Sequence, residues 1–317
     1  MEILYPKLNP YKKGYLNVSG GYKLYYELCG NPSGIPVLFL HGGPGAGFTE
    51  NDRRYFNPNK YNIILFDQRG AGKSKPFASL KANKTDKLVE DIIRILKFLK
   101  IKKIFLFGGS WGSSLALIYA IRYPETVIGM LLRGIYLCRP KDDKHYLANV
   151  KSFNPEAWNR LVSLVPKEAR KDILAYYHKQ MLSKDAKTRE KFTFEWSYYE
   201  ISISRLLIEQ NDVLNALKQF SYRSMSPIEV YYLKNNCFIE RDYILKNAGK
   251  LSKIPISIVH GRYDLICPPE AAYELHKKLK NSKLHFVLAG HSASEEEIQK
   301  KLVSEMDMFA EKFGELK

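Results

Sequence analysis

The first candidate for chemistry is Ser110, which lies among glycines in the stretch "GGSWG" (residues 108–112). An apolar, β-rich run precedes this serine, and the helical pattern "SSLALIYAIRYP" follows it. This context fits the G-x-S-x-G nucleophile elbow, in which a serine is held at a sharp turn between a strand and a helix. Only residues without a bulky side chain fit on both sides of such a turn. The stretch therefore predicts that Ser110 is a nucleophile.

A serine hydroxyl needs a base that accepts its proton and an acid that orients the base. Asp264 follows the apolar run 256–261, and His291 follows the run 284–290. Both residues fall in loops after predicted strands, in the chain order serine, acid, histidine that this motif carries. Three other histidines are weaker candidates because they lie within predicted strands or a helix: His260, His285 and His276. The sequence therefore predicts the triad Ser110, His291 and Asp264.

Attack of a serine on a carbonyl creates an oxyanion, which needs N–H donors already in place. The loop "HGGPGAG" (residues 41–47) follows a strong predicted strand and matches the HGG-type loop that supplies one donor. We expect the N–H groups of Gly43 and Trp111 to form the oxyanion hole. His41 in this loop is expected to be a structural hydrogen-bonding residue.

Two features are typical of proteins that bind nucleic acids or nucleotides, but the details of each argue against such binding here. The formal net charge is +17, but the lysines are scattered and no nucleic-acid-binding module is recognisable. The stretch "DQRGAGKS" (residues 67–74) ends like a phosphate-binding loop, yet Asp67 stands where that motif needs glycine. We therefore expect a basic, solvated surface and no nucleic-acid partner.

The predicted elements alternate between strands and helices, which indicates an α/β fold with a mostly parallel sheet. Continuous apolar runs suit strands that are buried on both faces. The runs are 37–42, 63–68, 104–109, 127–134, 256–261 and 284–290. The segment 86–100 has helical periodicity, and an antiparallel hairpin is predicted around Gly20 and Gly21.

Residues 140–245 do not continue the alternation of strands and helices; they show helical patterns rich in aromatic residues. We expect a helical cap domain over residues 140–245, inserted into a discontinuous core of residues 1–139 and 246–317. A cap over the carboxyl ends of the strands would roof the site that the sheet presents there.

The four cysteines are widely spaced and form no zinc or redox motif: Cys29, Cys138, Cys237 and Cys267. No apolar run is long enough to span a membrane, and the first residues lack the apolar stretch of a secretory signal. We expect a cytoplasmic protein with reduced thiols, no membrane association and no metal.

Beyond G-x-S-x-G, longer stretches of the chain resemble one family, the proline iminopeptidases (prolyl aminopeptidases) of the α/β-hydrolase superfamily. The stretches are "HGGPG", "DQRGAGKS", "GGSWGSSLALIYAIRYPE", "LLRGIYL", "VHGRYDLICP" and "AGHSA". The resemblance implies an α/β-hydrolase fold and a serine exopeptidase that releases N-terminal proline from peptides. It also implies that no cofactor or metal is needed.

The resemblance further implies that two glutamates of the cap bind the substrate amine. Glu200 ends "WSYYE", which is similar to the family pattern W-x-x-W-E, and Glu229 lies in "PIEVYYL", similar to R-I-E-x-H-Y-F. The chain departs from these patterns at Tyr199, Pro227 and Tyr231, so the surroundings of the two carboxylates are altered. A secondary ammonium needs anionic acceptors, which makes this assignment chemically sensible.

Four further residues match positions near the family's pocket for the proline ring: Arg133, Tyr136, Tyr146 and Cys267. Arg133 is equally compatible with a structural role as the partner of a buried glutamate. Two alternative functions stay open. One is a serine α/β-hydrolase that acts on small esters or amides, and the other is a non-catalytic ligand-binding protein on this fold. Preferred peptide length and oligomeric state are not predicted.

Overall fold

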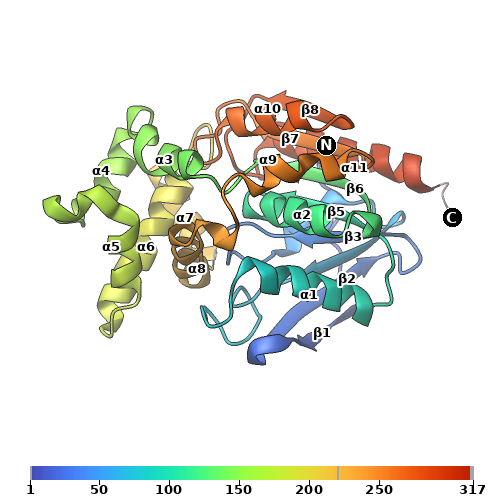
Figure 1. Ribbon diagram of the computed structural model, residues 1–317, viewed down its shortest axis with the longest axis horizontal. Coiled ribbons are helices and arrows are strands. Elements are labelled where there is room, and N and C mark those ends of the chain that lie inside the picture. Colours follow the sequence, from blue (N-terminus) through green and yellow to red (C-terminus); the bar gives the residue numbers. More distant parts are fainter. Residues whose placement is uncertain (1, 220, 315–317) are drawn as a thin grey trace.

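A single twisted sheet forms the centre of the computed structural model, which describes residues 2–219 and 221–314 (Figure 1). Its strand order is β1-β2-β4-β3-β5-β6-β7-β8. The strands are β1 Lys12–Asn17, β2 Lys23–Gly30, β3 Ile35–Leu40, β4 Tyr61–Phe66, β5 Ile104–Gly109, β6 Val127–Arg133, β7 Ile256–Gly261 and β8 Ser282–Val287. From β4 to β8 all neighbouring strands are parallel. The predicted mostly parallel α/β sheet is confirmed.

The N-terminal hairpin is also confirmed. β1 pairs with β2 in antiparallel register, with Tyr15 opposite Tyr25, and β2 then pairs antiparallel to β4. The turn contains Gly20 and Gly21, whose φ angles of 74° and 80° lie in the left-handed region that glycine adopts without strain.

Eleven α-helices occur in the described part of the chain. They are α1 Thr85–Phe98, α2 Trp111–Arg122, α3 Pro140–Ala148, α4 Pro155–Ser163, α5 Ile173–Met181, α6 Ala186–Ser202, α7 Gln210–Gln219, α8 Tyr222–Lys234, α9 Tyr243–Asn247, α10 Pro269–Lys278 and α11 Glu296–Gly314. None of these helices is both long and apolar enough to cross a membrane.

Successive residues of the central strands point to opposite faces of the sheet, and each face has its own hydrophobic core. Leu38 and Leu40 of β3 pack with side chains from α1, α2, α9 and α10. Val37 and Phe39 pack on the other face with side chains from α11 and the short helix Glu50–Tyr55. Burial on both faces explains why these strands are continuous apolar runs. β8 lies at the edge of the sheet and is only half-buried.

Helices α3 to α8, here called the cap helices, connect β6 to β7 and stand to one side of the sheet in Figure 1. They enclose a separate hydrophobic core in which aromatic residues such as Tyr177, Phe192 and Trp196 pack with aliphatic side chains. The predicted boundary between residues 245 and 246 falls inside α9. Since Ile244 of α9 packs in the core of the sheet, we propose that the cap ends before Tyr243.

Candidate active site

The turn at Ser110 has the geometry of a nucleophile elbow. Ser110 connects β5 to α2 with φ 56° and ψ −126°, a strained conformation for a residue with a side chain. The flanking glycines are needed because neighbouring backbone comes very close. A β-carbon at Gly112 would lie 2.0 Å from the carbonyl oxygen of Leu40, and one at Gly108 would lie 2.3 Å from that of Gly112. The crowding that was inferred from the glycine spacing is therefore present.

Asp264 and His291 lie in the loops that follow β7 and β8, at the same edge of the sheet as Ser110. His291 Nδ1 and Asp264 Oδ2 are 2.7 Å apart. The other carboxylate oxygen, Oδ1, accepts hydrogen bonds from the backbone N–H groups of Ile266 (3.0 Å) and Cys267 (2.8 Å). Burial alone would raise the pKa of Asp264, but the charge and hydrogen bond of His291 outweigh it, so the pKa lies below its ordinary value. This carboxylate is thus ionised and fixed where it can orient an imidazole.

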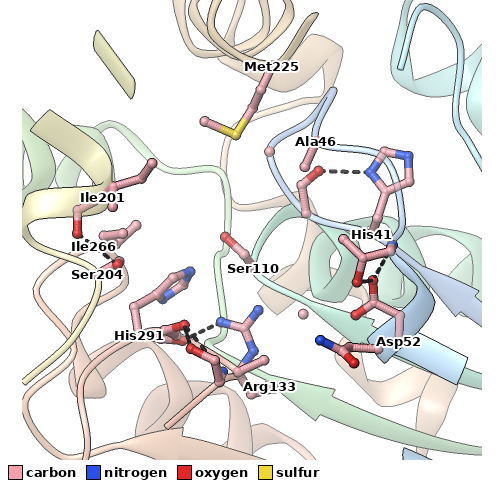
Figure 2. Close-up of a pocket in the computed structure, with 18 of the residues that line it drawn as sticks. His41, Ala46, Asp52, Ser110, Arg133, Ile201, Ser204, Met225, Ile266 and His291 are labelled. Atoms are coloured by element: carbon pink, nitrogen blue, oxygen red, sulfur yellow. Dashed lines mark hydrogen bonds between the residues drawn. The ribbon is translucent and has the colours of Figure 1, made fainter. Parts of the chain in front are cut away.

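Ser110 lines a cavity of about 430 Å³ together with Gly43, Glu200 and His291. Figure 2 shows Ser110 between His291 on one side and the loop of His41 and Ala46 on the other. No hydrogen bond joins the hydroxyl of Ser110 to the ring of His291 in this structure. Hydrogen bonds of a catalytic serine are often long without substrate and shorten when substrate binds.

The glycine-rich loop after β3 packs directly against Ser110. A β-carbon at Gly42 would lie 3.3 Å from the β-carbon of Ser110, and Gly43 has a φ of 101°. Trp111 is the first residue of α2, so its backbone N–H has no acceptor within the helix. The two predicted oxyanion donors therefore belong to two backbone segments that adjoin Ser110.

His41 has a structural environment. Its Nε2 accepts a hydrogen bond from the backbone N–H of Gln68 (2.9 Å), and burial lowers its pKa to about 4. The side chain of Gln68 donates to the carbonyl of His41 and accepts from the indole of Trp111, both at 2.9 Å. Gln68, in the "DQRG" stretch, thus supports both halves of the predicted oxyanion hole, a role that the sequence analysis did not predict.

The cap helices bring Glu200 and Glu229 together. Glu200 lies on α6 and Glu229 on the adjacent α8, where Glu229 Oε2 accepts a hydrogen bond from the indole of Trp196 (2.8 Å). Burial raises the pKa of Glu229 well above its ordinary value, and the charge of Glu200 and a hydrogen bond from it act in the same direction. Burial also raises the pKa of Glu200. The pair therefore holds a proton when no cation is bound.

Two polar atoms near this pair have no hydrogen-bond partner among the described residues, namely Glu200 Oε2 and the hydroxyl of Tyr146. Burial raises the pKa of Tyr146 well above its ordinary value, and the charges of the nearby Glu200 and Glu229 add to this rise. Tyr199 supports this wall, because its hydroxyl donates to the carbonyl of Tyr146. Buried polar atoms without partners are rare, so these two atoms are candidates for contact with a ligand.

The remaining predicted pocket residues lie in different surroundings. Cys267 is buried, and burial raises the pKa of its thiol well above the ordinary value. Arg133 lines the cavity, but its Nη1 donates to the carbonyl of His291 (2.6 Å) and it pairs with neither glutamate. The hydroxyl of Tyr136 donates to Asp143 (2.7 Å), outside the lining of this cavity.

Sequence analysis missed the contacts between the cap helices and the loop of His291. The carbonyl of Ser204 accepts hydrogen bonds from the N–H groups of His291 (2.8 Å) and Ser292 (2.7 Å). Glu295 accepts from the N–H groups of Gly290 (2.7 Å) and Leu206 (3.1 Å). Most of these contacts use backbone atoms, which leave no signature of residue type in a sequence.

No group of three or more His, Cys, Asp and Glu side chains within residues 2–219 and 221–314 is arranged to hold a metal ion. The side chains that the site brings together are a hydroxyl beside an oriented imidazole, and a pair of carboxyl groups that can accept a cation.

The fold and this arrangement define an α/β hydrolase. The family model described as "alpha/beta hydrolase fold" matches residues 35–298. An esterase from Exiguobacterium antarcticum has a solved structure that superposes with a TM-score of 0.66 at 20% identity, covering 95% of this chain and 100% of that one. At this level of identity the likeness concerns the fold alone.

Curated relatives are more similar in sequence than this solved structure, and they indicate a narrower family. A "Probable proline iminopeptidase" of Leptolyngbya boryana is 42% identical, with 98% of this chain and 97% of that protein covered. A proline iminopeptidase of Xylella fastidiosa (strain 9a5c) is 40% identical, over 98% of this chain and 100% of that protein. A proline iminopeptidase of Arabidopsis thaliana is 41% identical, with 95% of this chain and 80% of that protein covered. The chain belongs to the proline iminopeptidase family.

Proposed function

We propose that this protein is a serine exopeptidase that releases proline from the free N-terminus of peptides. The observation that carries the proposal is the carboxyl pair of Glu200 and Glu229 in the cap, close to the cavity that contains Ser110. A protonated proline nitrogen supplies positive charge and N–H donors, and Glu200 Oε2 has no other hydrogen-bond partner among the described residues. Ser110 then acts on the carbonyl that follows this nitrogen.

In the proposed mechanism, Ser110 Oγ attacks the proline carbonyl carbon while His291 Nε2 takes the hydroxyl proton. The N–H groups of Gly43 and Trp111 stabilise the oxyanion. His291 next gives the proton to the leaving amine, the C–N bond breaks, and an ester of proline with Ser110 remains. Water, deprotonated by His291, hydrolyses that ester and restores the serine. Asp264 keeps the imidazole oriented throughout.

Arg133 is proposed as a positioning residue, since its guanidinium holds the backbone of the His291 loop. Tyr146 and Cys267 are proposed to border the proline ring, while the contacts of Tyr136 with Asp143 support a role in positioning the start of α3. All four cysteines are free and buried, which fits a reducing compartment, and we propose the cytoplasm as the location.

The proposal is tested by comparing aminoacyl nitroanilides as substrates. We expect the largest kcat/KM for proline nitroanilide, a much smaller one for alanine nitroanilide, and no measurable hydrolysis of N-acetylproline nitroanilide. Acetylation removes both the charge and the donors that the carboxyl pair requires. Equal hydrolysis of the free and acetylated proline substrates would show that the amine is not bound in this way.

A further inference from the structure

The connection between α6 and α7 holds Arg205 beside the predicted catalytic base. Its preceding residue, Ser204, accepts hydrogen bonds from the N–H groups of His291 and Ser292, and its following residue, Leu206, donates to Glu295. Backbone packing is just as close, because a β-carbon at Gly290 would lie 3.1 Å from the α-carbon of Arg205. Arg205 is therefore anchored on both sides, next to the loop that carries His291.

The guanidinium of Arg205 has no hydrogen-bond or ion-pair partner among the residues that the structure describes. Arg205 is exposed and lines the same cavity as Ser110. The nearest carboxylate along this loop, Glu295, already accepts one backbone hydrogen bond at each of its oxygens. The other arginine of the lining, Arg133, is held by the carbonyl of His291. Arg205 is thus a free cation at the edge of the cavity.

The chemistry places the leaving part of the substrate on this side of the cavity. His291 must reach the leaving amine to protonate it, so the chain that follows the scissile bond begins at His291. Each further residue spans about 3.5 Å, so the C-terminus of a di- or tripeptide lies only one or two residue lengths from that point. A carboxylate there would lie in the cavity that Arg205 lines together with Ser110 and His291.

We propose that Arg205 binds the C-terminal carboxylate of short peptides, and that the enzyme prefers prolyl dipeptides and tripeptides with a free carboxylate. This inference rests on the proposed exopeptidase function. A short zwitterionic peptide then meets charge of opposite sign at both ends, the carboxyl pair of Glu200 and Glu229 at its amine and Arg205 at its carboxylate. A guanidinium suits this task because its planar N–H donors match a carboxylate.

The test compares Pro-Leu with Pro-Leu-amide, which differ in the terminal charge, and uses proline nitroanilide as the reference. The variants are Arg205→Gln and the control Arg241→Gln, an exposed arginine outside the cavity lining. In the wild type and the control we expect kcat/KM for the free acid to exceed that for the amide by about fivefold at low salt, as for an exposed charge pair. In Arg205→Gln the ratio of kcat/KM for the free acid to kcat/KM for the amide should approach one, because only the activity on the free acid is lost.

High salt, about 0.5 M, should reduce the wild-type preference and leave the ratio in Arg205→Gln unchanged, because salt screens exposed charges. A wild-type enzyme that cleaves proline nitroanilide and both peptides without preference would overturn the role of Arg205 and leave the exopeptidase function standing. If Arg205→Gln still preferred the free acid over the amide, the proposed role of Arg205 would be overturned as well. Failure to cleave any prolyl substrate would instead contradict the proposed function itself.

Discussion

Gly134 lies against the ring of His291, so closely that a side chain at this position would require the ring to shift. A β-carbon at Gly134 would be 2.9 Å from Cε1 and 3.1 Å from Nδ1 of the imidazole. The φ angle of Gly134 is 55°, which disfavours residues with side chains. The end of β6 therefore forms part of the wall that fixes the position of His291, together with Asp264 and the carbonyl of Ser204.

We expect Gly134→Ala to lower kcat strongly, because the new methyl group would displace the imidazole. A displacement of about 1 Å in a catalytic group costs on the order of a hundredfold in rate. Gly249→Ala is the control, since a β-carbon there meets nothing within 4 Å. The measurement is kcat for proline nitroanilide together with thermal unfolding of both variants. Unchanged kcat in Gly134→Ala would mean that His291 is not positioned by this contact.

Ser110→Ala should remove nearly all turnover and leave the fold intact. Loss of a serine nucleophile lowers kcat by more than about a thousandfold, and the oxyanion donors alone supply only residual catalysis. His291→Ala should behave in the same way, while Asp264→Asn should lose somewhat less because it misorients the base. Steady-state kinetics and covalent labelling with a fluorophosphonate check these expectations. If Ser110→Ala kept more than about a hundredth of the wild-type kcat, the triad assignment would be wrong.

The thiol of Cys267 is predicted to react slowly, and its alkylation is predicted to inhibit by filling space. Burial raises the pKa of this thiol well above its ordinary value, so little of the nucleophilic thiolate exists near neutral pH. Inactivation by iodoacetamide should therefore be slow, accelerate as the pH rises, and be retarded by a proline-containing inhibitor. Cys267→Ser should stay active and resist the reagent. A variant that is active and still inactivated would point to another cysteine, whereas an inactive variant would show that the thiol has a further role.

The pH profile of kcat/KM should differ between substrates with and without an amine. Burial, together with the charge of Glu200, raises the pKa of Glu229. Below that raised value the pair is protonated and binds an ammonium poorly, so kcat/KM for proline nitroanilide should rise as the pH passes through it. It should fall again above about pH 8, where an α-amino group loses its proton. Nitrophenyl acetate carries no ammonium and should show no such decline. Matching profiles for the two substrates would contradict the predicted role of the pair.

Much of the fold could be predicted from the sequence because the deciding signals are local. Apolar runs that are buried on both faces predicted the central strands, and the β-carbon clashes at Gly108 and Gly112 explain why the elbow is visible as a glycine pattern. Asp264 and His291 could be placed because both follow strands of a parallel sheet, whose carboxyl ends share one edge.

The amine site could be proposed only through resemblance to a family. Helical periodicity does not indicate that Glu200 of α6 and Glu229 of α8 approach each other, since that depends on how the cap helices pack. The contacts of Ser204 with the His291 loop depend on a backbone carbonyl, which any residue type provides. Arg205 likewise gave no sequence signal, because its significance comes only from its position beside that loop.

The central claim is that Glu229 and Glu200 bind the substrate amine, and the most direct measurement is a ratio of two activities in Glu229→Gln. The variant keeps an oxygen that can accept the hydrogen bond from Trp196 but removes the charge. Glu190→Gln, on the same helix as Glu200 and paired with the exposed Arg223, is the control. We predict that kcat/KM for proline nitroanilide falls at least about tenfold in Glu229→Gln, as for one lost charged contact, while slow hydrolysis of nitrophenyl acetate changes little. If both activities fell together, Glu229 would have a structural role, and if neither fell, the amine would be bound elsewhere.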